Sequence, residues 1–184
     1  MSDVIVIGGG AAGLSAALFT AKNGLDTAVF DTDETWLHHA HLFNYLGIES
    51  IDGDAFLETA QSQVTSFGAE QHQVAVTDVS RDGDGFTVTT AAGENSADYL
   101  VLATGSNRDL AETLGCAFTD DDTVAVDVTM ETSVDDAYAT GAMVRVEEWQ
   151  AIISAGDGAA AALNILSKEK GEHFHDFDTP EDAE

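Results

Sequence analysis

Residues 3–24 read DVIVIGGGAAGLSAALFTAKNG, and this stretch decides the fold. Residues 3–7 are a short β-branched run that ends directly at glycines, which predicts a buried strand. Residues 11–23 predict a helix with a packing face of small and apolar residues, with Lys22 in its last turn and Gly24 as its stop. A strand, a glycine turn and a helix in this order predict the start of a β-α-β unit.

The glycine turn, GGGAAG, has the spacing of a phosphate-binding turn. Gly8 allows the tight turn, Gly10 lets a pyrophosphate approach the backbone, and Gly13 permits close packing of helix on strand. The exposed amides at the helix start, including those of Ala11 and Ala12, can then hold negative phosphates. The alternative interpretation is a turn of glycines that binds no ligand.

Asp31 stands at the end of a second short strand, residues 27–30, which completes the β-α-β start. A carboxylate at this place can accept hydrogen bonds from ribose hydroxyls. Strand, turn, helix and acid together predict a dinucleotide-binding site. They do not choose between NAD and FAD.

The remaining elements follow from the spacing of apolar residues. We expect a helix at residues 54–67, strands at 74–80 and 86–90 around the turn RDGDG, a buried strand at 99–103, short strands at 124–128 and 137–140, and an alanine-rich helix at 150–166. This order predicts an α/β fold, with a central parallel sheet, helices and a small antiparallel β-meander. Residues 1–170 are expected to form one domain, and residues 171–184, which include Pro180, an acidic and loose tail.

The charge balance is extreme, with 34 acidic residues against 6 basic ones and a formal net charge of -28. The acidic residues are spread along the whole chain, which indicates a protein adapted to a salt-rich cytosol, where repulsion between the carboxylates is screened. The competing interpretation is an acidic interaction protein or nucleic-acid mimic. Binding to nucleic acid itself is not expected, because no basic patch can meet the phosphates.

Two further features narrow the protein's class. No apolar stretch is long enough to cross a membrane, and the start MSDVIVIGGG lacks the basic flank and cleavage site of a signal peptide, so we expect a cytoplasmic protein. Cys116 is the only cysteine, which excludes an intrachain disulfide, a CxxC pair and a cysteine zinc site within this chain.

Beyond the glycine turn, the chain resembles the FAD domain of the thioredoxin reductase family of pyridine nucleotide-disulfide oxidoreductases. The stretches that carry the resemblance are VIVIGGGAAGLSAAL (4–18), FNYLGIESIDGDAFLETAQSQVTSFGAE (43–70), FTVTTAAGENSADYLVLATG (86–105), METSVDDAYATG (130–141) and WQAIISAGDGAAAAL (149–163). The ATG at 103–105 and the TSVDDAYATG at 132–141 are typical of flavoproteins with two dinucleotide sites. The resemblance implies a Rossmann-like FAD-binding fold.

The resemblance also assigns roles by position. It implies that FAD is held at Gly8, Gly10, Ala11, Ala12, Gly13, Asp31, Asn44, Val76, Ala103, Thr104, Gly105, Gly141, Gln150 and Ala151. Asn44 would lie beside the flavin, and the backbone near Val76 would meet the adenine edge. Gln150 would begin a last helix whose positive end faces the flavin and stabilises its reduced form. The alternatives are a turn asparagine at 44 and a solvent-facing helix cap at 150.

The chain departs from the family pattern in three ways. A connection of residues 106–131 stands where the family inserts an NADPH-binding domain, and it is too short for one. The family's redox-active CxxC is missing, and Cys116, in what reads as a loop-like stretch after LAETLG, is interpreted as structural or incidental. The family's Gly-Asp reads Gly141-Ala142, and Trp149, which could stack on the flavin or fill space, replaces an arginine. This chain alone is therefore not expected to be a thioredoxin reductase.

His38, His39 and His41 fall where the family has a polar loop beside the flavin. The simplest interpretation is a polar surface loop. The alternatives are proton donors near the flavin and a transition-metal site, and we assign no metal ligands and no catalytic residues.

The functional hypothesis is an FAD-dependent oxidoreductase that passes electrons between an external donor and an acceptor, neither of which the sequence identifies. The alternatives are a non-enzymatic FAD-binding module, a redox sensor or subunit that needs a separate NAD-binding partner, and a fold that binds another nucleotide. A homodimer is an expected assembly, and neither nucleic acid nor membrane is an expected partner.

Overall fold

The computed structural model describes residues 1–83 and 85–179, and Pro180 with the end of the acidic tail lies outside the described residues. The helices are α1 (Ala11–Lys22), α2 (Gly53–Ser66), α3 (Asp109–Leu114) and α4 (Ala151–Lys170), with 3₁₀ turns η1 (Trp36–His39) and η2 (Gly141–Val144). The strands are β1 (Ser2–Ile7), β2 (Thr27–Asp31), β3 (His41–Leu42), β4 (Ile51–Asp52), β5 (Glu70–Gln73), β6 (Val76–Asp82), β7 (Gly85–Thr90), β8 (Gly93–Leu102) and β9 (Ala137–Ala139).

The main sheet confirms the expected α/β class. Its strand order is β5-β2-β1-β8-β7-β6, and β9 also pairs with β8. β5, β2, β1, β8 and β9 run parallel, whereas β6, β7 and the first half of β8 form an antiparallel meander. One edge of β8 therefore pairs first with β7 and then with β9, so the parallel sheet and the meander share a single long strand.

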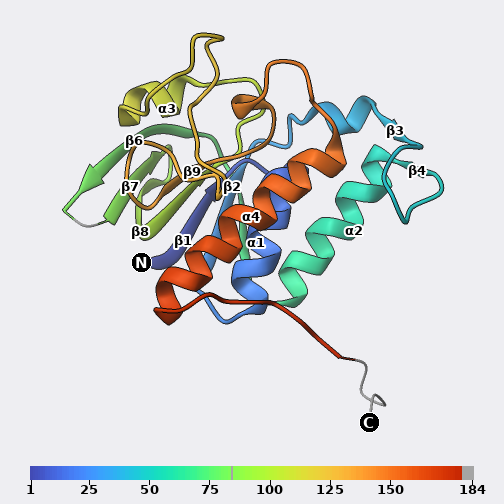
Figure 1. Cartoon of the computed structure of the whole chain (residues 1–184), viewed down its shortest axis with the longest axis horizontal. Helices are drawn as coiled ribbons and strands as arrows, with labels where there is room; N and C mark the ends of the chain where they lie inside the picture. Colours follow the sequence, from blue (N-terminus) through green and yellow to red (C-terminus); the bar gives the residue numbers. More distant parts are fainter. Residues whose placement is uncertain (84, 180–184) are drawn as a thin grey trace.

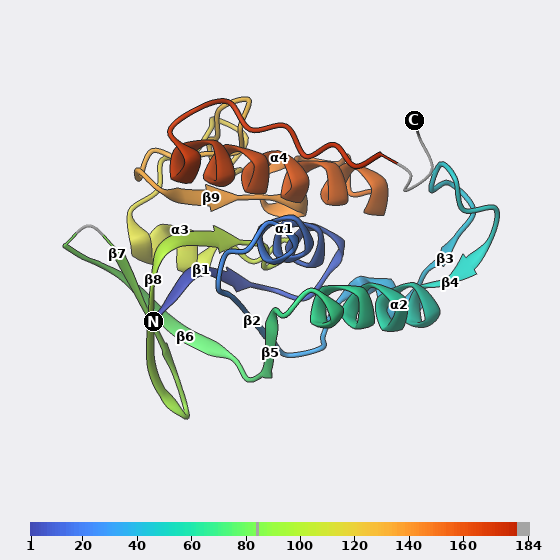
Figure 2. The same cartoon turned by 90° about the horizontal axis from the view of Figure 1, so that it is seen from below.

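Each face of the parallel strands supports its own hydrophobic core. Alternate side chains of β1, such as Val4 and Val6, pack with α1, α2 and α4. The intervening ones, such as Ile5 and Ile7, pack with the meander, α3 and the loop after it. In Figure 1 α4, α1 and α2 lie side by side, and in Figure 2 the hairpins of the meander project on the left, away from α2 on the right. The sheet is thus covered on both faces, as a parallel sheet requires.

The contact between α1 and α4 depends on small residues. A Cβ atom added at Gly158 of α4 would lie 2.0 Å from the carbonyl oxygen of Ala12 and 3.1 Å from the amide nitrogen of Ala16, so the two helix backbones touch there. Lys22 ends α1 and contacts Asp176, which follows α4. The two helices therefore run in the same direction, and both begin at the same edge of the sheet.

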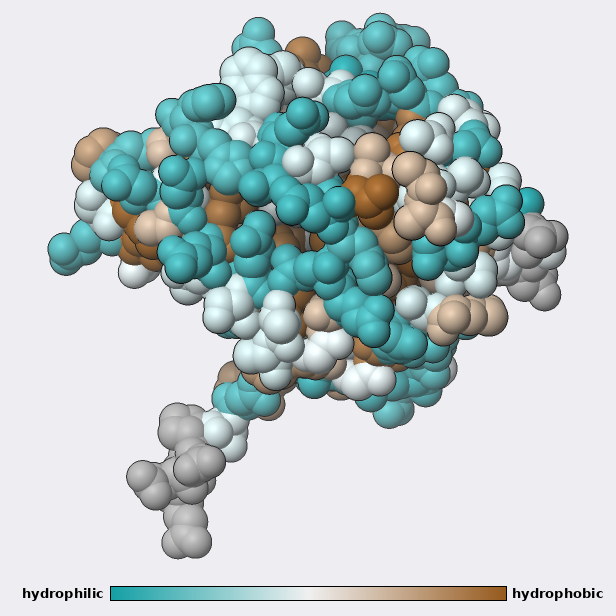
Figure 3. Space-filling model, turned by 180° about the vertical axis from the view of Figure 1, so that it is seen from behind, coloured by the Kyte–Doolittle hydropathy of each residue, from teal (hydrophilic) through white to brown (hydrophobic). Residues whose placement is uncertain are grey.

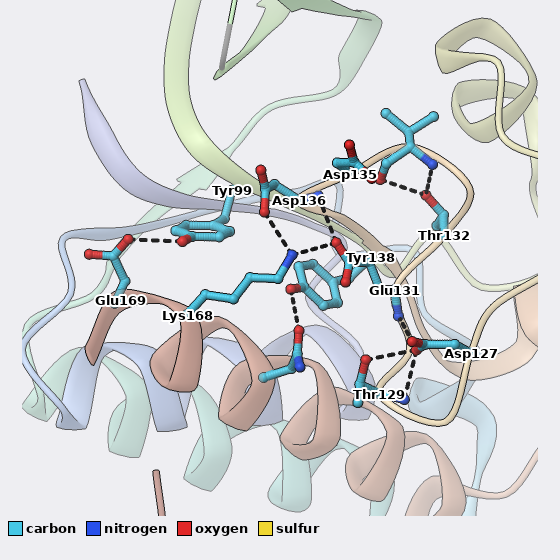
Figure 4. Close-up of polar contacts among 12 residues, drawn as sticks. Tyr99, Asp127, Thr129, Glu131, Thr132, Asp135, Asp136, Tyr138, Lys168 and Glu169 are labelled. Atoms are coloured by element: carbon cyan, nitrogen blue, oxygen red, sulfur yellow. Dashed lines mark hydrogen bonds and ion pairs between the residues drawn. The ribbon is translucent and has the colours of Figure 1, made fainter. Parts of the chain in front are cut away.

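Two tyrosines join the second half of α4 to the sheet (Figure 4). The Tyr99 hydroxyl of β8 donates to Glu169 at 2.9 Å, and the Tyr138 hydroxyl of β9 donates to the Asn164 side chain at 2.6 Å. Burial raises the pKa of both phenols. Both hydroxyls are therefore protonated at neutral pH. Their hydrogen bonds fix the position of α4 along the direction of β8 and β9.

Lys168 adds an ionic contact between α4 and the loop that leads into β9 (Figure 4). Its Nζ lies 2.8 Å from Asp136 and 2.5 Å from Glu131. Burial would lower the pKa of Lys168, but the hydrogen bonds to the two carboxylates outweigh that effect and raise it. Asp136 has a left-handed backbone, with φ of 66°, and this contact helps to hold it.

The strand expected at residues 124–128 is wrong. Only Val124 forms a bridge, to Phe118, and Val128 is 88% exposed. The Asp127 side chain accepts hydrogen bonds from Thr129 and from the amide of Glu131, which turns the chain. A local side-chain turn thus replaces the strand that the valines indicate.

The expectation of a loop-like stretch before Cys116 is also wrong, because the residues LAETL form part of α3. Gly115 ends that helix with φ of 84°. Other elements were not anticipated either, among them the short strands β3 and β4 and the 3₁₀ turns η1 and η2. β5 has the polar sequence EQHQ, and β8 begins at Gly93, six residues before the expected strand at 99–103, because its first half pairs with β7.

The surface reflects the charge balance. Figure 3 shows the face opposite to Figure 1, where hydrophilic residues are spread across the visible surface and hydrophobic residues form separate patches among them. Several of the few basic side chains form ion pairs. Lys22, for example, pairs with Asp176 and Asp178 of the tail. Within residues 1–83 and 85–179, no helix is both long and apolar enough to cross a bilayer.

The excess of carboxylates predicts a stability that rises with salt. Raising KCl from about 0.1 M to about 2 M shortens the screening length from about 10 Å to a few Å and should raise the melting temperature by about 10 °C or more. Differential scanning calorimetry in KCl, repeated in NaCl at equal ionic strength, measures this shift. A melting temperature that stays constant across the series would contradict the expectation.

The close contact of α1 and α4 predicts opposite effects at two glycines of the same helix. Gly158→Ala places a methyl group against the Ala12 carbonyl and should lower the free energy of unfolding by about 1–3 kcal/mol. Gly156→Ala is the matched control, because no atom outside its own stretch of helix lies within 4 Å of the added Cβ. That change should raise the free energy of unfolding by up to about 1 kcal/mol. Urea unfolding of both variants checks the pair, and equal effects at the two sites would refute the contact.

Candidate functional site

The carboxyl ends of the parallel strands form one edge of the sheet. The register pairs Ile7 of β1 with Phe30 of β2 and with Leu102 of β8, and it pairs Leu102 with Ala139 of β9. The four strands therefore end at the same level. In open α/β sheets this edge is where ligands bind.

Most of the residues that the sequence indicates as ligand-binding follow these strand ends. Those at the edge are Gly8, Gly10, Ala11, Ala12 and Gly13 after β1, Asp31 at the end of β2, Ala103, Thr104 and Gly105 after β8, and Gly141 after β9. Gln150 and Ala151 start α4, and Asn44 lies between β3 and β4. Val76 is apart from these, at the start of β6, where it packs against the core beneath the sheet.

Gly8 and Gly13 are required by the packing of the turn itself. Gly8 has φ of 114°, and a Cβ there would lie 2.2 Å from the carbonyl oxygen of Ala103. A Cβ at Gly13 would lie 1.8 Å from the carbonyl oxygen of Gly8. The backbones of β1, α1 and the end of β8 thus approach one another with no room for side chains.

Gly10 is different, because the fold does not need a glycine there. A Cβ at Gly10 would meet only the Thr35 hydroxyl, at 3.4 Å, and the backbone (φ -79°, ψ -173°) suits any residue. Gly10 is also the N-cap of α1; in the described part of the chain no side chain caps this helix, and its first turn has no acidic residue. The open backbone and the free amides at the positive end of the helix suit an anionic group.

Asp31 is held next to the turn by backbone donors. Its Oδ1 accepts from the Gly9 amide at 2.8 Å, and its Oδ2 accepts from the Asp33 amide at 3.0 Å. A Cβ at Gly9 would lie 2.5 Å from Asp31 Oδ2, so the middle glycine makes room for the carboxylate. Sequence reasoning missed Gly9 and Asp33, because the glycine spacing alone gives no sign of these contacts.

The start of α4 lies beyond the start of α1. Gly158 touches the first turn of α1, and Gln150 precedes it by eight residues, about 12 Å of helix. The Asn44 side chain donates to Gln150 Oε1 at 2.7 Å. The fold therefore brings together two residues to which the family resemblance assigns a place beside a flavin, although they are 106 positions apart.

An ion pair stands near the position where the family aspartate is replaced by Ala142. Arg145 Nη2 lies 2.5 Å from Oδ1 of Asp157, whose side chain is only 7% exposed. The hydrogen bond to Asp157 raises the pKa of Arg145. Trp149 donates its indole N–H to the Arg145 carbonyl at 3.2 Å and is 47% exposed. This partly buried pair fixes the segment that leads into α4, and no motif in the sequence indicates it.

The histidines contact carboxylates. His38 lies 2.6 Å from Asp54 and 2.9 Å from Asp33, and His41 contacts Asp52. The hydrogen bonds to Asp54 and Asp33 raise the pKa of His38. In the described residues, no group of three or more histidine, cysteine or acidic side chains is arranged to hold a metal ion. His38 and His41 line a cavity of about 550 Å³ between η1 and the start of α2.

Cys116 follows Gly115 at the end of α3 and is buried in the core below the sheet, 7% exposed. Burial raises the pKa of its thiol. A buried thiol with a raised pKa reacts slowly, because the thiolate is the reactive form.

Comparison with known proteins gives a consistent result. The pyridine nucleotide-disulphide oxidoreductase family matches residues 2–107 and 54–156. The thioredoxin reductase of Treponema pallidum is 35% identical over 110 residues, which cover 58% of this chain and 36% of that protein. The thioredoxin reductase of Listeria monocytogenes is 35% identical over 110 residues, with coverage of 58% and 34%. The chain thus spans about a third of the length of these curated relatives.

The same fold occurs in solved structures. A thioredoxin reductase from Gloeobacter violaceus superposes with a TM-score of 0.88 at 20% identity, over 97% of this chain and 99% of that one. The resemblance to a Rossmann-like reductase fold therefore extends through nearly the whole chain.

Proposed function

The chain belongs to the pyridine nucleotide-disulphide oxidoreductase family, and from this premise we propose that it binds FAD at the carboxyl edge of its sheet and passes electrons between an external donor and an acceptor. The observation that carries the proposal is the open backbone at Gly10 between two glycines that the fold requires. A glycine without a structural need is explained by the close approach of a ligand.

The residues at the sheet edge fit FAD from its adenosine ribose to its ring system. The amides of Gly10–Gly13 would hold the pyrophosphate, and Asp31 would accept hydrogen bonds from the adenosine ribose. Asn44 and Gln150 would flank the isoalloxazine. The adenine would extend toward β6, at Val76. From the ribose to the isoalloxazine, this order follows the sheet edge from β2 across β1 to the start of α4, and Val76 lies apart from that edge.

The start of α4 favours negative charge. In the described residues no side chain caps it, and no acidic residue lies in its first turn. Its positive end is directed away from the contact with α1, toward Asn44. FAD supplies a ring system that takes up and gives off electrons. The helix end would stabilise the additional negative charge of the reduced ring.

The electron donor and the acceptor are proposed to be separate molecules. Residues 106–131 hold only α3 and a loop that packs against the core below the sheet. The single cysteine is buried in that core, so this chain cannot form the intrachain disulfide of a thioredoxin reductase. A reduced nicotinamide, a ferredoxin or a separate NAD-binding subunit would serve as donor.

The buried and single Cys116 also favours a second candidate, a non-enzymatic FAD module or redox sensor. Anaerobic mixing of the FAD-loaded protein with NADH or NADPH separates the two in part. Bleaching of the flavin absorbance within seconds supports the oxidoreductase. No bleaching by the nicotinamides, together with slow reoxidation of the dithionite-reduced flavin by every protein acceptor tried, supports the module.

Gly10→Ala tests the proposed site without disturbing the fold. The added methyl group has space in the protein but would meet the pyrophosphate, so the dissociation constant for FAD should rise at least about tenfold. The melting temperature should stay within about 2 °C of the wild-type value. Quenching of FAD fluorescence on titration gives the affinity, and Gly156→Ala serves as the control. Unchanged affinity in a folded Gly10→Ala protein would refute the proposed site.

A further inference from the structure

A continuous chain of hydrogen bonds runs from the glycine turn to α2. Asp31 accepts from the Gly9 amide at 2.8 Å and from the Asp33 amide at 3.0 Å. The Asp33 side chain lies 2.9 Å from Nε2 of His38, and Nδ1 of His38 lies 2.6 Å from Asp54 in the first turn of α2. These hydrogen bonds connect the glycine turn, the end of β2, η1 and α2.

The conformation of Asp33 needs this support. Its φ is 61°, a left-handed backbone that is unfavourable for a residue with a side chain. The contacts that hold it are its amide on Asp31 and its carboxylate on His38. Release of the Asp33 side chain would free the turn and remove one of the two donors that orient Asp31.

His38 can hold both carboxylates in only one protonation state. An imidazolium donates from both ring nitrogens, whereas a neutral ring donates from one and turns a lone pair toward the other carboxylate. The titratable groups around His38 are Asp33 on the preceding loop and, along the cavity, His39, His41, Asp52, Asp54 and Glu58. The acidic groups among them favour the charged ring.

We propose that His38 is a positioning residue for the ribose carboxylate Asp31, acts through Asp33, and makes FAD affinity fall as the pH rises. The inference rests on the proposed function, because it takes Asp31 as the acceptor for the adenosine ribose. The sign follows from the chemistry. The folded protein raises the pKa of His38, so the double contact is complete at low pH and is lost as the pH rises through that raised pKa.

The test measures the FAD dissociation constant from pH 5.5 to pH 9 by fluorescence quenching of FAD on cofactor-free protein in molar KCl. The wild-type constant should rise roughly tenfold across the titration of His38. His38→Gln should give a pH-independent constant near the weak, high-pH value. His38→Lys keeps a cation between the two aspartates and should bind tightly throughout. His39→Gln, the matched control in η1, should keep the wild-type step.

An FAD analogue with 2′,3′-dideoxyadenosine distinguishes positioning from a simple charge effect. The analogue lacks the ribose hydroxyls from which Asp31 would accept hydrogen bonds, so its dissociation constant should show no step with pH. A long-range effect of the His38 charge would instead give the same pH-dependent step for both ligands. A flat wild-type profile, a step that survives in His38→Gln, or an equal step with the analogue would each overturn the proposal. Absence of FAD binding at every pH would instead contradict the proposed function itself.

Discussion

The structure depends on one close contact between backbones. At the glycine turn, β1 and α1 pass so near to each other and to the end of β8 that neither Gly8 nor Gly13 has space for a Cβ atom. This contact sets the angle at which α1 leaves the sheet and leaves the amides of its first turn at the sheet edge. The same packing that buries the apolar side chains of β1 thus leaves a site at the start of α1 where backbone amides with positive partial charge are exposed.

A second backbone contact, between α1 and α4, extends this site along the sheet edge. Gly158 lets α4 lie directly on α1, and the tyrosines of β8 and β9 fix its position along the sheet. The start of α4 therefore reaches past the start of α1 to the Asn44–Gln150 contact. Two helix ends with the same polarity then lie along one edge of the sheet. A ligand with phosphates at one end and a ring that gains negative charge at the other complements this arrangement.

The elements that the sequence predicts are those with a local signal. The buried strand and the glycines of residues 3–24 carry such signals. β5 carries none, because all four of its residues are polar; it pairs with β2 through backbone hydrogen bonds, and the His72 ring stacks on Phe30. At 124–128 the valines indicated a strand, but the Asp127 side chain turns the chain. In the candidate site, the positions of Asp31 and Gly10 followed from the motif. The links of Asp31 to Gly9 and His38 depend on folding and had no signal in the spacing.

The most direct measurement is a crystal structure of the protein with FAD, grown in molar salt. The account predicts pyrophosphate oxygens within hydrogen-bond distance of the amides at Gly10–Gly13, with the isoalloxazine against the start of α4. Cofactor bound in the cavity beside His38, with nothing at the glycine turn, would contradict it.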